Sequence, residues 1–261
     1  MRRYWEDMTA GMAAALPPDT VAVLPVASIE QHGPHLPLST DAVICRGILA
    51  RAVDLAPDGL PLAVLPLMPL GHAPEHTAFA GTLSLPAELL LRLWKEVARQ
   101  VHRAGVRRLV LFNAHGGNPP VMDILAMELR AELGMLVVPA GWMRLGLPDG
   151  VVEEDELAWG IHGGLVETSV MLHLRPDLVR DDRAQAWRSE ATRIAAENRL
   201  LRAYGRIGMG WMAQDLNPAG VVGDAAAADA ETGRALVEHA AARLVELLGE
   251  VRRFPVERFG R

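Results

Sequence analysis

The chain has 261 residues, of which 50% are hydrophobic and 22% are charged, and its formal net charge is −6. A chain of this length can bury one large core, so we expect a single domain over residues 1–261. The negative charge, without long basic runs, argues against a nucleic-acid partner, and the lack of long apolar runs argues against a membrane partner or a signal peptide. We therefore expect a cytoplasmic protein.

In chain order, four short apolar runs rich in Val and Leu are typical of buried parallel strands. These runs are Val21–Ser28, Leu62–Pro66, Arg108–Phe112 and Met135–Pro139. Between them, apolar residues recur every three or four positions, which predicts helices over Ala42–Leu55, Ala87–Ala104 and Val121–Leu133. This alternation of strands and helices predicts right-handed βαβ units and a sheet covered on both faces. The predicted fold class is therefore α/β.

After Gly141 the pattern changes. Leu165–Leu174 is predicted to be a helix that ends before Pro176, and Ala184–Tyr204 is predicted to be a long surface helix. A stretch rich in Gly and Met then precedes a final helix, expected over about Ala228–Val251. Because the sequence contains no repeat, low-complexity tract or clear linker, one domain remains the expectation.

Polar residues collect where the predicted strands end. Ser28–Asp41 follows the first strand, Gly71–His76 the second, and Asn113–Asn118 the third. In an open α/β sheet, the carboxyl ends of the strands form the crevice in which ligands bind. Six of the nine histidines lie in loops or at helix starts: His32, His35, His72, His76, His115 and His162. For any one of them alone, a surface histidine is the simpler interpretation. Several histidines that converge with carboxylates indicate a functional site instead.

The first of these segments carries three candidate metal ligands. Glu30 and His32 are two residues apart, so in an extended backbone their side chains leave the same face. Asp41 precedes a predicted helix, where it is either an N-cap that contributes about 1 kcal/mol or a carboxylate that bridges two cations. Histidine together with Asp and Glu suits Zn²⁺, Mn²⁺ or Fe²⁺. Two such ions would activate a shared water and stabilise an oxyanion.

A second candidate pair lies further along the chain. His162 precedes two glycines, and Glu167 falls in the first turn of the next predicted helix. The helix dipole alone favours a carboxylate at that position. The functional alternative places both side chains in the metal cleft, with His162 as a proton shuttle and Glu167 as a ligand or base.

Other motifs are incomplete. His115-Gly-Gly is similar to the oxyanion loop of some serine hydrolases, but the sequence has no Gly-x-Ser-x-Gly element to supply a nucleophile. The glycines of residues 205–210 have the wrong spacing for a dinucleotide site. Cys45 is the single cysteine and falls inside a predicted helix, so we expect a packed small residue and no disulfide.

One long segment resembles the signature of the creatininase family of amidohydrolases: Val26-Ala-Ser-Ile-Glu-Gln-His-Gly-Pro-His-Leu-Pro-Leu-Ser-Thr-Asp41. Residues 74–85, 113–118 and 162–169 resemble other blocks of this family in the same order. The resemblance runs from about Tyr4 to the last helix. It implies a three-layer α/β/α sandwich with a mostly parallel sheet and a site for two metal ions, Zn or Mn and sometimes Fe. It also implies hydrolysis of a non-peptide or cyclic amide and, frequently, a homohexamer.

The resemblance also implies roles for particular residues. Glu30, Asp41 and His115 match the ligands of one metal, and His32 and Asp41 match those of the other, so that Asp41 would bridge. His162 matches the catalytic histidine of the family.

The sequence departs from true creatininases at positions that matter for the substrate. Creatininases carry a tyrosine and a metal-binding glutamate where this chain has Gly116 and Gly117. They also carry a Trp-Asp pair that grips creatinine, and the corresponding residues here are Ala158 and Trp159. Creatinine is therefore not the expected substrate, and we expect Glu167 to replace the missing glutamate as a metal ligand. The Asn-x-His-Gly-Gly-Asn form resembles members of other pathways, among them a formamide hydrolase of deazaflavin synthesis and a peptidase of mycofactocin maturation.

We therefore interpret the chain as a dinuclear metal hydrolase of a small-molecule amide. A metal-bound hydroxide would attack the carbonyl, and His162 would pass a proton to the leaving nitrogen. Two alternatives stay open. The chain could be a peptidase or formamide hydrolase that acts on a modified peptide or cofactor precursor. It could instead be a non-catalytic homologue that binds a metal or another ligand.

Overall fold

The computed structural model describes residues 2–258, and within them the central sheet has four parallel strands in the order β2-β1-β3-β4. The strands are β1 (Val21–Val26), β2 (Leu62–Val64), β3 (Arg108–Asn113) and β4 (Leu136–Gly141). Strand β1 lies in the middle and pairs with β3 over its whole length, from Val21 opposite Arg108 to Val26 opposite Asn113. Both β1 and β3 are buried throughout, as expected for parallel strands covered on two faces.

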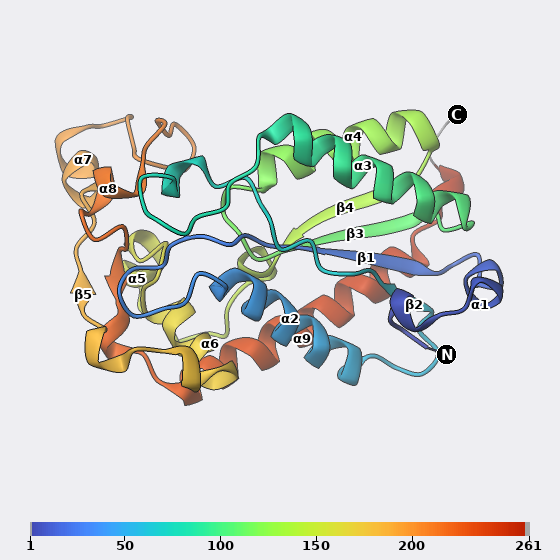
Figure 1. Cartoon of the computed structure of the whole chain (residues 1–261), viewed down its shortest axis with the longest axis horizontal. Coiled ribbons are helices and arrows are strands. Elements are labelled where there is room, and N and C mark those ends of the chain that lie inside the picture. Colours follow the sequence, from blue (N-terminus) through green and yellow to red (C-terminus); the bar gives the residue numbers. More distant parts are fainter. Residues whose placement is uncertain (1, 259–261) are drawn as a thin grey trace.

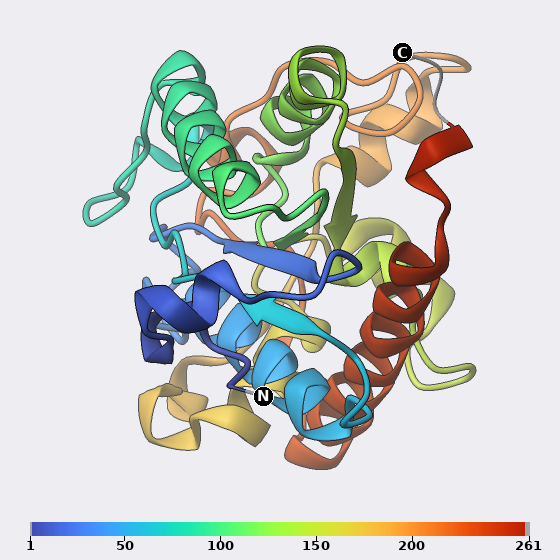
Figure 2. The ribbon, with the colours of Figure 1, turned by 90° about the vertical axis from the view of Figure 1, so that its right-hand side faces the viewer.

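Helices cover both faces of this sheet, which gives the expected three-layer α/β/α sandwich (Figures 1 and 2). Helices α3 and α4 pack on one face, and α2, α6 and α9 pack on the other. The side chains of β1 alternate accordingly, with Leu24 in the core under α3 and α4 and Val23 in the core over α2 and α9. The helices of the two layers are α2 (Thr40–Leu55), α3 (Ala87–Arg103), α4 (Pro119–Leu133), α6 (Leu165–Leu174) and α9 (Ala230–Arg253).

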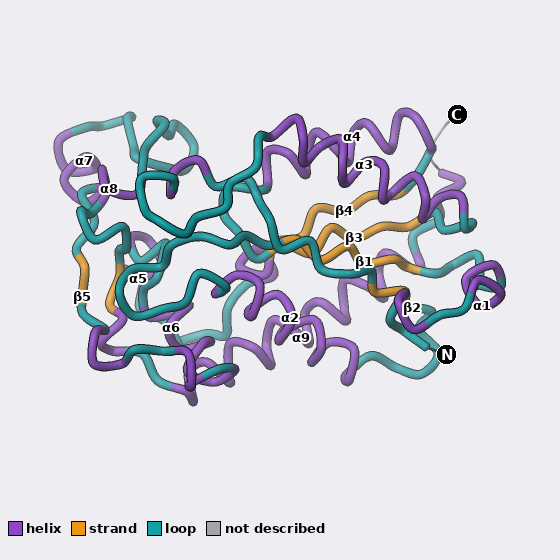
Figure 3. Tube along the Cα trace, viewed as in Figure 1, coloured by secondary structure: helices purple, strands orange, loops and turns teal. Residues whose placement is uncertain are grey.

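The remaining elements are short, and most of them lie with the loops beyond the carboxyl ends of the strands (Figure 3). They are α1 (Ala10–Ala14), α5 (Glu154–Trp159), α7 (Ala191–Glu197), α8 (Ala213–Leu216) and the antiparallel pair β5 (Ala186–Trp187) and β6 (Gly223–Asp224). Of these elements, α1 lies at the opposite end, just before β1. Within residues 2–258, no helix combines the length and the apolar character that crossing a membrane requires.

The predicted strands and the helices that cover the sheet are confirmed, with ends that differ by a few residues. The long surface helix predicted over Ala184–Tyr204 is wrong. Only α7 forms there, because Ala186–Trp187 pairs with β6 instead and the Trp187 ring packs 5.0 Å from the ring of His35. Ser189 then accepts a hydrogen bond from the Ala191 N–H at the start of α7. Tertiary pairing thus overrides the local helix propensity.

Candidate metal centre

The predicted site residues come together at the carboxyl ends of β1 and β3. Glu30 and His32 lie in the loop after β1, and His115 lies in the loop after β3. Asp41 and Glu167 occupy the first turns of α2 and α6. Four of these five side chains are at most 2% exposed, and that of Glu167 is 16% exposed. The sheet edge therefore gathers residues that are up to 137 positions apart (167 − 30 = 137).

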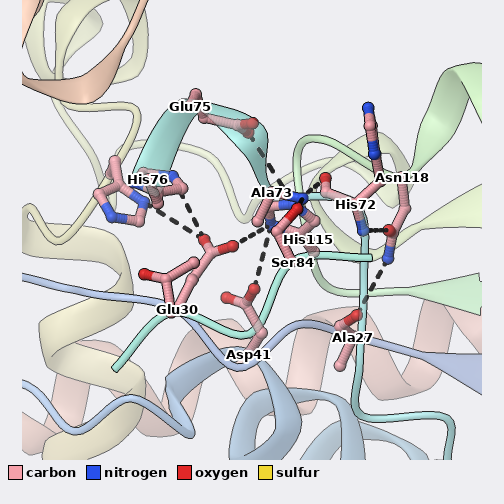
Figure 4. A network of polar contacts seen from close by, with 12 residues as sticks. Ala27, Glu30, Asp41, His72, Ala73, Glu75, His76, Ser84, His115 and Asn118 are labelled. Carbon is pink, nitrogen blue, oxygen red and sulfur yellow. Dashed lines mark hydrogen bonds and ion pairs between the residues drawn. The ribbon is translucent and has the colours of Figure 1, made fainter. Parts of the chain in front are cut away.

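The first cluster consists of Glu30, Asp41 and His115 (Figure 4). His115 Nδ1 lies 3.0 Å from Glu30 Oε2 and 3.2 Å from Asp41 Oδ2. The other ring nitrogen, Nε2, donates a hydrogen bond of 2.9 Å to the carbonyl of His72. With Nε2 bonded in this way, Nδ1 faces two carboxylate oxygens, and either a proton or a cation between these atoms offsets their mutual repulsion.

The second cluster consists of His32, Asp41 and Glu167. His32 Nε2 lies 3.3 Å from Asp41 Oδ1 and 3.8 Å from Glu167 Oε2. His32 Nδ1 donates to the carbonyl of Glu30 at 3.1 Å, which leaves Nε2 free to act as a ligand. Asp41 thus presents one oxygen to each cluster, which is the arrangement of a bridging carboxylate.

The donor atoms of both clusters fit divalent cations. Glu30 Oε2, His32 Nε2 and Asp41 Oδ2 are buried and make no hydrogen bond within the described part of the chain. Leaving such atoms without a partner is costly, because burial removes the water that would otherwise solvate them. A mixed set of imidazole nitrogens and carboxylate oxygens suits Zn²⁺, Mn²⁺ or Fe²⁺.

The pKa values of these groups show how strongly the clusters attract positive charge. Burial acts to lower the pKa of His32, but the carboxylates of Asp41, Glu167 and Glu30 together outweigh it and raise that pKa to about 9. Burial likewise acts to lower the pKa of His115, and Glu30 and Asp41 raise it well above its usual value. Burial raises the pKa of Glu167 to about 7. Without cations, protons therefore occupy the places between imidazole and carboxylate.

These pKa shifts predict that metal binding releases protons. His32 keeps its proton up to about pH 9, so a cation must displace that proton at neutral pH. We expect the apparent metal affinity to rise about tenfold per pH unit for each proton released, at pH values below about 9. Isothermal titration calorimetry of the metal-free protein, in buffers of different ionisation enthalpy, measures both effects. An affinity independent of pH between 6 and 8 would contradict this picture of the ligand set.

His162 lies beside both clusters, as its predicted role requires. Its Nδ1 is 3.9 Å from Glu30 Oε1, and its ring centroid is 4.2 Å from that of His32. Burial lowers the pKa of His162 well below its usual value, so the ring is neutral and one of its nitrogens carries a lone pair. His162 also groups with Glu30 and His32 as a possible set of metal ligands, so its role as proton shuttle stays a prediction.

The structure adds His76 to the site, which the sequence analysis left among the loop histidines. His76 Nε2 lies 3.5 Å from Glu30 Oε1, and its ring stacks on that of His162 at 4.2 Å. His76 ends the short 3₁₀ helix Pro74–His76 in the loop that follows β2. The carboxyl end of β2 lies at the same edge of the sheet as the carboxyl ends of β1 and β3. This signal could have indicated that His76 belongs to the site.

The other two loop histidines support the site from outside. His35 is buried, and its Nε2 lies 3.0 Å from both the Gly163 carbonyl and Thr168 Oγ1, so it holds the turn next to His162. His72 uses its backbone carbonyl to orient His115, while its own ring nitrogen Nδ1 donates to the Leu85 carbonyl.

Local structure bears on the alternatives for the two helix carboxylates and decides the one for Asp41. The N-cap alternative for Asp41 is wrong, because α2 begins at Thr40 and its N-cap is Ser39. Asp41 is instead turned into the site. Glu167 has a local role as well, since its Oε2 accepts a hydrogen bond of 2.6 Å from the Gly163 N–H. Cys45 is buried in α2, where burial raises the pKa of its thiol, and it packs as expected.

A cavity of about 270 Å³ opens onto both clusters. Its floor contains Glu30, Asp41 and His115, and its wall includes His76 and His162. The rest of the lining consists of Glu75, Gly116, Ile161, Glu167, Tyr204 and Trp211. The cavity therefore offers space for a small amide group against the clustered ligands, and two aromatic side chains are part of its lining.

Comparisons with known proteins agree with this geometry. The family profile described as creatinine amidohydrolase matches residues 6–248. The mycofactocin precursor peptide peptidase of Mycobacterium tuberculosis is 38% identical over 219 residues, covering 81% of this chain and 78% of that protein. The creatinine amidohydrolase of Pseudomonas putida is 32% identical over 195 residues, covering 69% of this chain and 72% of that protein. A solved structure from Bacteroides fragilis, assigned as a creatinine amidohydrolase, superposes with a TM-score of 0.82 at 25% identity, covering 98% of this chain and 99% of that one.

Proposed function

The chain belongs to the creatininase family of metal-dependent amidohydrolases, and on that premise we propose that it hydrolyses an amide C–N bond at a centre for two divalent cations. The observation that carries the proposal is the position of Asp41, whose two oxygens face separate ligand clusters. Glu30 and His115 complete the first ligand set, and His32 and Glu167 complete the second. The donor types favour zinc or manganese, with iron as a further option.

Each residue of the site has a defined part in this reaction. Two divalent cations would lower the pKa of a water molecule and polarise the amide carbonyl. Asp41 holds the two ligand sets at a fixed separation. His162, on the cavity wall, takes a proton from the water and passes it to the leaving nitrogen. The buried ligands keep bulk water away from the reacting atoms, which strengthens the electrostatic interactions in the cavity.

Two substrate classes follow from two different observations. Family membership supports a cyclic or other non-peptide amide. The 38% identity to mycofactocin precursor peptide peptidases, over 81% of this chain, supports an amide within a modified peptide. Tyr204, Trp211 and Ile161 on the cavity wall also provide apolar contact for a substrate larger than creatinine. We favour the modified peptide for that reason.

One experiment separates these possibilities from a non-catalytic role. The metal-free protein is reloaded with Zn²⁺ or Mn²⁺ and incubated with cyclic amides, formamides and peptides with modified C-termini. Turnover that requires metal and is removed by a chelator supports the hydrolase, and the class turned over identifies the substrate type. Full metal loading with no turnover on any member of the panel would support a metal-binding role instead.

We expect little or no creatinine hydrolysis. Creatininases carry a glutamate at the position of Gly117, yet a Cβ atom added here would lie 2.6 Å from His115 Nε2 and 2.9 Å from Glu75 Oε1. The backbone carbonyl of His72 is nearer still, so a glutamate could enter at this position only if the backbone around it moved. Creatinine turnover is measured beside a true creatininase, and comparable rates would show that Gly116 and Gly117 do not determine the substrate.

A further inference from the structure

The side-chain amide of Gln31 has one possible orientation. Its Nε2 lies 2.6 Å from the carbonyl of Gly220, and its Oε1 lies 3.0 Å from the backbone nitrogen of Gly33. A carbonyl oxygen needs a donor, and a backbone N–H needs an acceptor. Exchanging the amide nitrogen and oxygen would therefore break both bonds, so the backbone fixes which side of the amide donates.

This orientation determines the tautomer of His76. The Gln31 amide nitrogen has two hydrogens: one goes to the Gly220 carbonyl, and the other points at His76 Nδ1, 2.8 Å away. His76 Nδ1 must accept, so the neutral ring carries its proton on Nε2. That N–H lies 3.5 Å from Glu30 Oε1, and His76 is part of the cavity lining.

The same residue determines the tautomer of His162. His162 Nε2 lies 2.8 Å from the backbone carbonyl of Gln31, to which it must donate. It also lies 3.2 Å from the Gln31 side-chain nitrogen, but both hydrogens of that nitrogen are already used. The His162 proton is therefore on Nε2, and the lone pair on Nδ1 faces Glu30 Oε1 and the cavity.

Two stacked rings thus present opposite groups to the cavity: His162 a lone pair, and His76 an N–H. We propose that His76 is a second catalytic histidine. Its Nε2 donates a hydrogen bond to the oxygen of the scissile amide as negative charge develops on that oxygen. Gln31 is the positioning residue that fixes the tautomers of both rings. The proposal rests on the amide hydrolysis proposed above. In this proposal His76 stabilises the oxyanion in the transition state, and His162 transfers the proton.

Glutamine substitutions test the two roles against each other, because a glutamine amide places an N–H near the position of histidine Nε2 but cannot shuttle a proton. We expect His76→Gln to keep kcat within about tenfold, whereas His76→Leu, of similar volume, loses ~10²–10³-fold in kcat with a smaller change in KM. His162→Gln should lose as much activity as His162→Ala. Equal losses in His76→Gln and His76→Leu, or a fully active His76→Leu, would overturn the proposal.

A second measurement does not depend on turnover. Nitrogen NMR of the histidine rings, on ¹⁵N-histidine-labelled and zinc-loaded protein, distinguishes protonated from unprotonated ring nitrogens. We expect Nε2–H on both His76 and His162 in the wild type, and a shift of the His76 proton to Nδ1 in Gln31→Glu. An Nδ1–H on His76 in the wild type would overturn the inference whatever the activity. Correct tautomers in a protein that turns over no amide would instead contradict the proposed function, and with it the catalytic role of His76.

Discussion

Asp41→Asn is expected to remove at least one metal ion from the centre and to lower turnover by about 10²-fold or more, because substituting a residue that only orients a metal ligand already costs ~10–100-fold. The wild-type carboxylate directs Oδ2 at His115 and Oδ1 at His32. An asparagine has only one oxygen, and its amide nitrogen cannot bind a cation, so one cluster loses a ligand. Metal content per chain and amide turnover are measured on the same preparation.

The matched control for this substitution is Asp54→Asn. Asp54 is exposed on the same helix, α2, so it tests the loss of a carboxylate without the loss of a ligand. Its metal content and rate should equal those of the wild type, and circular dichroism should show that both variants keep the fold. Two metals and wild-type turnover in Asp41→Asn would mean that this residue does not bridge.

His162→Ala and Glu167→Gln are expected to separate catalysis from metal binding. His162→Ala should keep both metals and lose ~10²–10⁴-fold in rate, the usual range for a general acid–base group. Glu167→Gln should lose one metal, because its Oε2, 3.8 Å from His32 Nε2, completes the second cluster. The glutamine oxygen can still accept the hydrogen bond from Gly163, so the turn before α6 should persist.

The two variants can also show the opposite pattern of metal loss, which would exchange the roles of His162 and Glu167. His162 Nδ1 also groups with Glu30 and His32 as a possible ligand set. If His162→Ala loses a metal while Glu167→Gln keeps two, then His162 is the ligand and Glu167 serves as the base. Metal analysis and rates on both variants decide between the two assignments.

Much of this site could be predicted because the sheet is parallel. The apolar runs predict the strands, and the carboxyl ends of parallel strands lie at one edge, so Glu30 and His115 are expected to meet although 85 residues separate them (115 − 30 = 85). Glu167 was expected to stand in for the glutamate missing at Gly117, and the structure places it beside His32 and Asp41.

What could not be predicted depends on contacts that leave no local pattern. Gln31 meets His76 across 45 residues and Gly220 across 189, so its sequence neighbours do not indicate which hydrogen bonds it makes. The helix expected over residues 184–204 failed for a related reason, because the pairing of β5 with β6 outweighs local propensity. The N-cap alternative for Asp41 depended on a helix boundary, the feature that sequence patterns determine least well.

The central claim, a centre that holds two cations around Asp41, is tested most directly by counting metal ions. The metal-free protein is titrated with Zn²⁺ at neutral pH and passed through a desalting column. Zinc is then measured by inductively coupled plasma mass spectrometry and divided by the protein concentration. The arrangement of Glu30, His115, His32 and Glu167 around Asp41 predicts two zinc ions per chain. One ion per chain, or none, would contradict it.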